Sequence, residues 1–166
     1  MPRIDFYVLP SQRPNDRSLL ACRLAEKAYS LGHRIYIHAS SAAQAKGLDE
    51  LLWTFRQGSF IPHAVYPGAA QDNSPVLLGW GESAYQALAT LRSLPEPNAG
   101  PENRDSDGTQ ETRTLLINLA LETPACFEQF HRIVEVVDQD PEILAAARKK
   151  FRQFRAHGYE PNSHKL

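Results

Sequence analysis

The sequence predicts a single-domain α/β protein of three layers, with a mainly parallel or a mixed sheet flanked by helices. The chain has 166 residues, the length of one ordinary domain. Hydrophobic residues make up 42% and charged residues 22%, which is the composition of a globular protein. β-branched and aromatic runs alternate with segments of helical periodicity, an order typical of parallel strands joined by helices.

Two strand–helix pairs are expected in the first part of the chain. The strands are rich in β-branched and aromatic residues, and the helices carry apolar residues at helical spacing. Gly32 stands where a helix commonly ends, because glycine adopts the left-handed conformation easily. The expected strands are Ile4–Leu9 and Arg34–His38, and the expected helices are Asp16–Leu31 and a segment capped by Ser40 or Ser41 that runs through Trp53.

The middle of the chain is less regular. Phe60–His63 is expected to be a short extended segment, Pro75–Trp80 a buried strand, and Ser83–Leu94 a short helix. Pro95–Thr112 contains almost no apolar residues and cannot contribute to a core. We interpret residues 95–112 as a mobile surface insertion within one domain of residues 1–166.

Regular structure is expected again from residue 114. Asp140 followed by Pro141 is a strong signal for a helix start, and Gly158 follows the helix that these residues begin. The polar segment 159–166 is expected to be a C-terminal tail. The expected elements are strands Thr114–Leu119 and Arg132–Asp138, and helices Pro124–Phe130 and Pro141–His157.

Little in the sequence indicates catalysis. The loop Pro10–Asp16 lacks glycine, so the arrangement is Rossmann-like without a nucleotide-binding loop. The six histidines do not show metal-site spacing, and Cys22 and Cys126 are expected to be free thiols. We therefore expect no enzyme activity, no metal and no cofactor. The apolar run Phe6–Leu9 is too short for a secretory or membrane segment, so a cytoplasmic protein without membrane partners is expected.

Positive charge is concentrated in the expected C-terminal helix, although the net charge of the chain is only -1. Arg148, Arg152 and Arg155 recur at i, i+4 and i+7 and share one helix face, with Lys149 beside them and Lys150 farther round. This row fits a solvated helix surface, where cations complement the helix dipole. It also fits a site for an acidic peptide, because an apolar stripe adjoins it. That stripe consists of Leu144, Ala147, Phe151 and Phe154.

A second apolar group spans the end of the helix through Trp53 and the following extended segment. It contains Trp53, Phe55, Phe60 and Ile61. Such a group belongs either to the core or, because polar residues 56–59 interrupt it, to an exposed interaction surface.

The order of these segments resembles the chi subunit family of bacterial DNA polymerase III over nearly the whole chain. The marks of the resemblance are Phe6–Leu9, Leu48–Trp53, Ser59–His63 and the arginine spacing within Arg148–Gly158. The resemblance implies a non-catalytic accessory subunit of the clamp-loader complex. It implies two partners, the psi subunit and the acidic C-terminal tail of the single-stranded-DNA-binding protein, without strong direct binding to nucleic acid.

Carried over by position, the resemblance places the tail site on the C-terminal helix. Arg148 and Arg152 would bind carboxylates, Phe151 stands where the family commonly has tyrosine, and Val137 and Gly158 would border the pocket.

The chain departs from the family at one position of this site. Leu144 occupies a position that is usually basic, so part of the charge must come from Lys149 or Arg155. The psi contact would fall on Trp53, Phe60 and the adjoining Ile61. The alternative function, suggested by the α/β order alone, is a degenerate domain that binds nucleotides or single-stranded nucleic acid.

Overall fold

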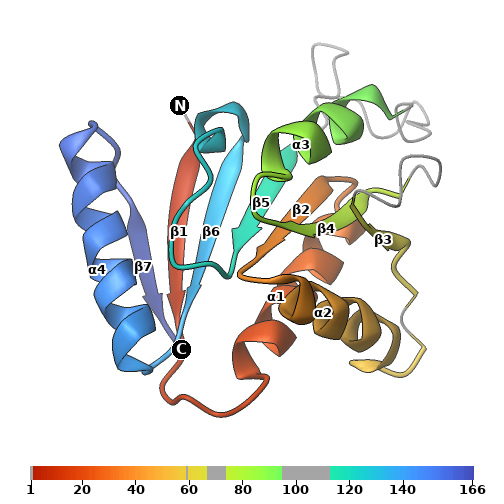
Figure 1. The fold of residues 1–166 in the computed structure, drawn as a ribbon, viewed down its shortest axis with the longest axis horizontal. Coiled ribbons are helices and arrows are strands. Elements are labelled where there is room, and N and C mark those ends of the chain that lie inside the picture. Colours follow the sequence, from red (N-terminus) through yellow and green to blue (C-terminus); the bar gives the residue numbers. More distant parts are fainter. Residues whose placement is uncertain (1, 59, 67–73, 95–112) are drawn as a thin grey trace.

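A seven-stranded sheet forms the centre of the protein, which we describe from a computed structural model covering residues 2–58, 60–66, 74–94 and 113–166. Every described strand pair is parallel, and the strand order is β3-β4-β2-β5-β6-β1-β7 (Figure 1). The predicted fold class is therefore confirmed. The strands are β1 (Arg3–Val8), β2 (Arg34–Ala39), β3 (His63–Val65), β4 (Val76–Trp80), β5 (Thr114–Asn118), β6 (Arg132–Val137) and β7 (Asn162–Lys165).

Four helices cover the two faces of the sheet. Helices α1 (Asp16–Ser30) and α2 (Ala42–Thr54) contribute to one apolar core, which includes the buried Ile37 and Val134. Helices α3 (Ala84–Ser93) and α4 (Pro141–Ala156) contribute to the second core on the opposite face. The result is a helix–sheet–helix sandwich of three layers.

The predicted helix boundaries have clear local causes. The Ser41 hydroxyl accepts a hydrogen bond from the backbone N–H of Gln44 at 3.1 Å and caps α2. Gly32 follows α1 with a φ of +82°, as expected for the residue after a helix end. Asp140 caps α4, since its carboxylate accepts hydrogen bonds from the N–H groups of Glu142 and Ile143.

The prediction of a helix over Pro124–Phe130 was wrong in extent. Only a single 3₁₀ turn, η2 (Phe127–Gln129), forms there. A segment of seven residues offers few helical hydrogen bonds, so tertiary contacts determine its shape. Its last residue, Phe130, is 2% exposed and contributes to the second core.

The expected C-terminal tail was also wrong, because residues 162–165 form strand β7. This strand lies beside β1 in parallel register, with Tyr7 opposite His164. Backbone hydrogen bonds along the edge of β1 order a segment that has no apolar pattern. The predicted insertion over 95–112 lies outside the described residues. Among the helices that the structure describes, none is long and apolar enough to cross a membrane.

Candidate functional site

Helix α4, which carries the predicted peptide-binding residues, has well-defined ends. Asp140 caps its first turn, and Gly158 follows its last turn with a φ of +89°. The N–H of Tyr159 donates to the Phe154 carbonyl at 3.0 Å, and the N–H of Gly158 donates to the Arg155 carbonyl at 3.1 Å. This pair of bonds is a Schellman motif, which satisfies the carbonyl groups at the end of the helix.

Aromatic contacts fix the inner face of α4 against the sheet. The Phe154 side chain is buried, and its ring centroid lies 6.1 Å from that of Phe6 on β1. Phe151 is half-buried, with its ring centroid 5.4 Å from that of Phe6. Leu144 is also half-buried in this core, two helical turns before Phe151.

The predicted cationic residues lie outside this contact but do not form one group. Arg148, Arg152 and Arg155 are all exposed on α4. Because successive residues turn by about 100° around a helix, Arg148 and Arg155 lie close to Phe151 in angle, and Lys149 does not. Lys149 instead lines a cavity between α4 and the segment after β5, together with Gln153 and His157.

The two residues expected to border the pocket lie near opposite ends of α4. Val137, at the end of β6, is only 3% exposed, whereas Gly158 is exposed after the last turn. Phe151 lies between them, because it shares the second core with Val137 and precedes Gly158 by about 10 Å along the helix.

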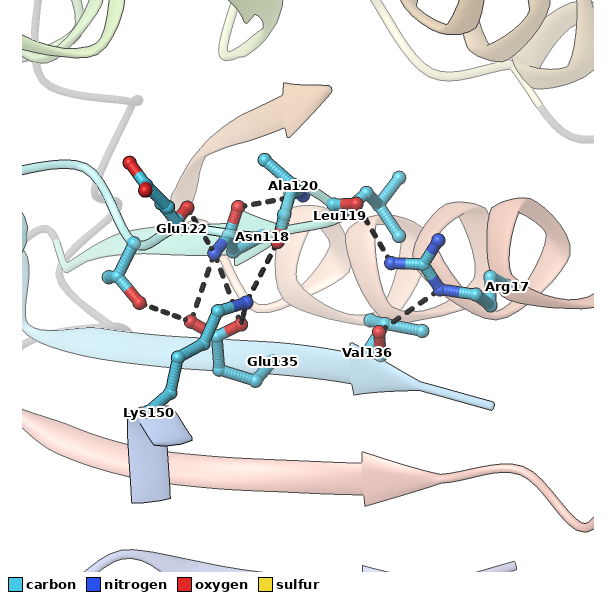
Figure 2. A network of polar contacts seen from close by, with 9 residues as sticks. Arg17, Asn118, Leu119, Ala120, Glu122, Glu135, Val136 and Lys150 are labelled. Atoms are coloured by element: carbon cyan, nitrogen blue, oxygen red, sulfur yellow. Dashed lines mark hydrogen bonds and ion pairs between the residues drawn. The ribbon is translucent and has the colours of Figure 1, made fainter. Parts of the chain in front are cut away.

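A buried polar network under α4 was not predicted. The Lys150 ammonium lies 2.8 Å from the Glu135 carboxylate on β6 and donates to the Ala120 carbonyl at 2.8 Å (Figure 2). Asn118 and Thr123 also donate to the Glu135 carboxylate. The signal available in the sequence was a glutamate inside an otherwise apolar strand, because a buried charge requires a partner.

Arg17 occupies the carboxyl-terminal edge of the sheet, where open α/β sheets commonly bind ligands. Its guanidinium donates to the Val136 carbonyl at 3.1 Å and to the Leu119 carbonyl at 2.8 Å (Figure 2). A side chain from α1 therefore satisfies the ends of β5 and β6. This arrangement gives no support to the alternative function of nucleotide binding.

The second predicted surface lies at the β3 edge of the sheet. Trp53 and Phe60 are 55% and 67% exposed, with ring centroids 5.8 Å apart. We call these two side chains the aromatic patch. His63 supports the patch, because its ring lies 4.7 Å from Trp53 and is hydrogen-bonded to the Ile61 and Asp49 carbonyl groups.

Ile61, which we assigned to the same surface, is 2% exposed and belongs to the first core. Its side chain is not accessible to a partner in this structure. It anchors the chain between Phe60 and His63 instead.

These features define a class of protein: a three-layer α/β domain with exposed arginines on the helix near one sheet edge and exposed aromatic rings at the other. The family described as "DNA polymerase III chi subunit, HolC" matches the chain over residues 1–162. The chain belongs to this family of DNA polymerase III chi subunits and is thus a replication subunit.

Curated relatives agree with this assignment. The DNA polymerase III subunit chi of Pseudomonas aeruginosa is 41% identical over 166 residues, which cover 100% of this chain and 98% of the relative. The subunit chi of Haemophilus influenzae is 28% identical over 93% of this chain and 90% of the relative. That of Escherichia coli is 24% identical, with 98% and 97% covered.

Proposed function

We propose that this chain is a non-catalytic, cytoplasmic accessory subunit of the clamp-loader complex of DNA polymerase III. It links the psi subunit to the acidic C-terminal tail of the single-stranded-DNA-binding protein and uses no cofactor. The observation that carries the proposal is the row of exposed Arg148 and Arg152 on α4, with Arg148 one turn from half-buried Phe151, on a helix with a firmly packed inner face.

The chemistry of this helix suits an acidic peptide. Guanidinium groups bind carboxylates through charge-assisted hydrogen bonds. Phe151 and Leu144 offer apolar surface for a hydrophobic side chain of the peptide, and Arg155 adds charge on the same side. Lys149 faces the cavity on the other side of α4, so we assign it a smaller contribution than Arg155.

Calorimetry with a synthetic peptide containing several aspartates and a C-terminal phenylalanine tests the tail site. Binding should weaken as salt rises, because exposed charge pairs are screened. The variant Arg148→Glu, Arg152→Glu should lose binding. The control Arg23→Glu, Lys46→Glu makes the same charge change at exposed positions of α1 and α2 and should bind normally. Equal affinity in both variants would reject the site.

The aromatic patch is the proposed contact for psi. Two large exposed aromatic side chains side by side are typical of the centre of a protein interface. The strand order puts β3 and β7 at opposite edges of the sheet, so the patch and α4 can hold two partners at the same time.

Co-purification with psi from the same organism tests this contact. The variant Trp53→Ala, Phe60→Ala should lose psi and still bind the tail peptide. The control Leu31→Ala, Tyr85→Ala removes two other exposed apolar side chains and should retain psi. Retention of psi by the first variant would assign psi to another surface.

A further inference from the structure

A groove lined by cationic side chains lies on the face of the sheet that α1 covers. Its volume is about 350 Å³, and its wall includes Tyr7, Leu24 and Leu31. We call it the basic groove. Its charged and titratable lining residues are Arg3, Lys27, His33, Arg113, His131 and Arg132.

The groove has a strong excess of positive charge. Four of its lining residues are arginine or lysine, and none of the lining residues that the structure describes is acidic. Among the described residues, the Asp5 carboxylate is fully buried beneath the groove and pairs with both Arg3 and Arg132. The chain as a whole has a net charge of -1, so this excess is local.

The environment of His33 combines burial with this local positive charge. Burial lowers the pKa of His33, and the neighbouring charges of Arg113, Arg132 and His131 lower it further.

Asp5 holds part of the groove in a fixed geometry. Its carboxylate lies 3.0 Å from Nε of Arg3 and 2.8 Å from Nε of Arg132, and it is hydrogen-bonded to His164 at 2.9 Å. Arg132 also donates to the Tyr7 hydroxyl at 3.0 Å. The two arginines are therefore positioned before any ligand binds, which reduces the entropy lost on binding.

The cationic residues form a row across the sheet. In the parallel register, Arg3 on β1 lies opposite Arg132 on β6. Arg132 in turn lies opposite Leu115 on β5, and Arg113 is two residues before Leu115 on the same side of that strand. His33 continues the row, because Arg34 lies opposite Thr114. Four strands at a spacing of about 4.8 Å span about 14 Å, so the row matches a chain of repeated negative charges better than a single anion.

We propose that the basic groove binds the phosphate backbone of single-stranded DNA. Guanidinium groups pair with phosphate in a bidentate geometry, and three of the four permanent cations are arginines. DNA is the polyanion present wherever a DNA polymerase subunit works. The contact is sequence-independent, because phosphate contacts carry no information about the bases.

The groove and the proposed tail site lie on opposite faces of the sheet. Tyr7 packs against the core shared with α1 and α2, whereas Phe6 packs against α4. A DNA strand in the groove therefore does not compete with a peptide on α4. Loss of one activity should leave the other unchanged, so the two proposals can fail separately.

Fluorescence anisotropy with a short labelled oligothymidylate, at low and rising salt, tests the proposal on the full chain. The logarithm of affinity should fall with the logarithm of salt, with a slope of about -0.7 for each phosphate contacted. The variant Lys27→Glu, Arg113→Glu leaves Asp5 and its partners intact and should bind about tenfold more weakly or worse, with a shallower slope. The control Arg23→Glu, Lys46→Glu should bind like the wild type.

Several outcomes would overturn the proposal. Absence of binding at low salt would do so, as would equal affinity in the groove variant and its control. Loss of DNA binding in Arg148→Glu, Arg152→Glu would move the contact to α4. If a polyaspartate peptide bound at the groove more tightly than the oligonucleotide, the groove would be a site for an acidic protein segment instead.

Discussion

Lys150 of α4 and Glu135 of β6 form a buried ion pair at 2.8 Å, and their side chains are only 9% and 2% exposed. Lys150 stands in a run of basic residues, yet it faces away from solvent while Arg148 and Lys149 face outward. The pair and the contacts of Phe151 and Phe154 with Phe6 together orient α4 on the sheet, so that Arg148 and Lys149 face outward.

Replacing Lys150 with methionine should strongly destabilise the protein. The substitution leaves the Glu135 carboxylate buried with only neutral donors, and breaking such a pair costs about 3 kcal/mol or more. Adding Glu135→Gln to Lys150→Met removes the unpaired charge, so this double variant should recover part of the lost stability. Urea unfolding of both single variants and the double variant measures the coupling. A double variant no more stable than Lys150→Met would contradict the assignment.

His38 should make the protein less stable as pH falls from about 6.5 to about 4. Burial, and secondarily the charge of Lys150, lowers the pKa of His38 from 6.5 to about 4 in the folded chain. Between these values the unfolded chain binds a proton and the folded chain does not, so stability increases with pH across this window. The full effect is about 3 kcal/mol, at about 1.4 kcal/mol for each pH unit.

Urea unfolding at several pH values measures this dependence. The variant His38→Gln should flatten the curve between pH 4 and 6.5. The control His157→Gln removes an exposed histidine instead, and so separates the effect of His38 from the loss of any imidazole. A curve for His38→Gln as steep as that of the wild type would assign the effect to other groups.

The elements that could be predicted from the sequence are those with strong local signals. Asp140 and Pro141 define the start of α4, and the strand Arg132–Val137, rich in valine and isoleucine, precedes it. The cationic residues of α4 were visible in the sequence as a set, but their distribution around the helix was not. Packing fixes the rotation of the helix. Lys149 therefore lines a cavity and Lys150 is buried against Glu135, whereas Arg148 is exposed.

Features that depend on long-range pairing could not be predicted. The basic groove joins residues that are far apart in the sequence, such as Arg3 and Arg132, and no local pattern indicates that they share one carboxylate. Strand β7 could not be predicted for the same reason, because pairing with the backbone of β1 orders it. Ile61 was assigned to a surface because its neighbours are apolar, whereas its side chain points into the core.

Two exposed glycines should respond in opposite ways to alanine. Gly158 has a φ of +89°, where an L side chain is strained, so Gly158→Ala should destabilise the protein by about 1 kcal/mol. Gly47 lies inside α2 with open space where a Cβ would be, so Gly47→Ala should stabilise the protein by about 0.5 to 1 kcal/mol. Urea midpoints measure both effects, and shifts of the same sign would contradict this interpretation.

Removing strand β7 should destabilise the protein and promote self-association. In a variant ending at residue 161, β1 becomes an edge strand with unpaired backbone groups, and such edges pair readily with other chains. Asp5 also loses its hydrogen bond with His164, whose ring stacks on Tyr7 at 4.8 Å.

The variant His164→Ala separates these two effects, because it removes the side chain and keeps the strand. It should lower stability without promoting association.

Burial raises the pKa of Asp5, but hydrogen bonds from His164 and Arg132 outweigh it and lower the pKa of this carboxyl group. The resulting stabilisation is present above the unfolded pKa of 3.8 and is lost as pH falls through the folded pKa. His164→Ala should therefore be less destabilised, relative to the wild type, in acid than at pH 7. Urea unfolding at both pH values measures stability, and light scattering measures association. If His164→Ala associated to the same extent as the truncated chain, the role of the strand edge would be contradicted.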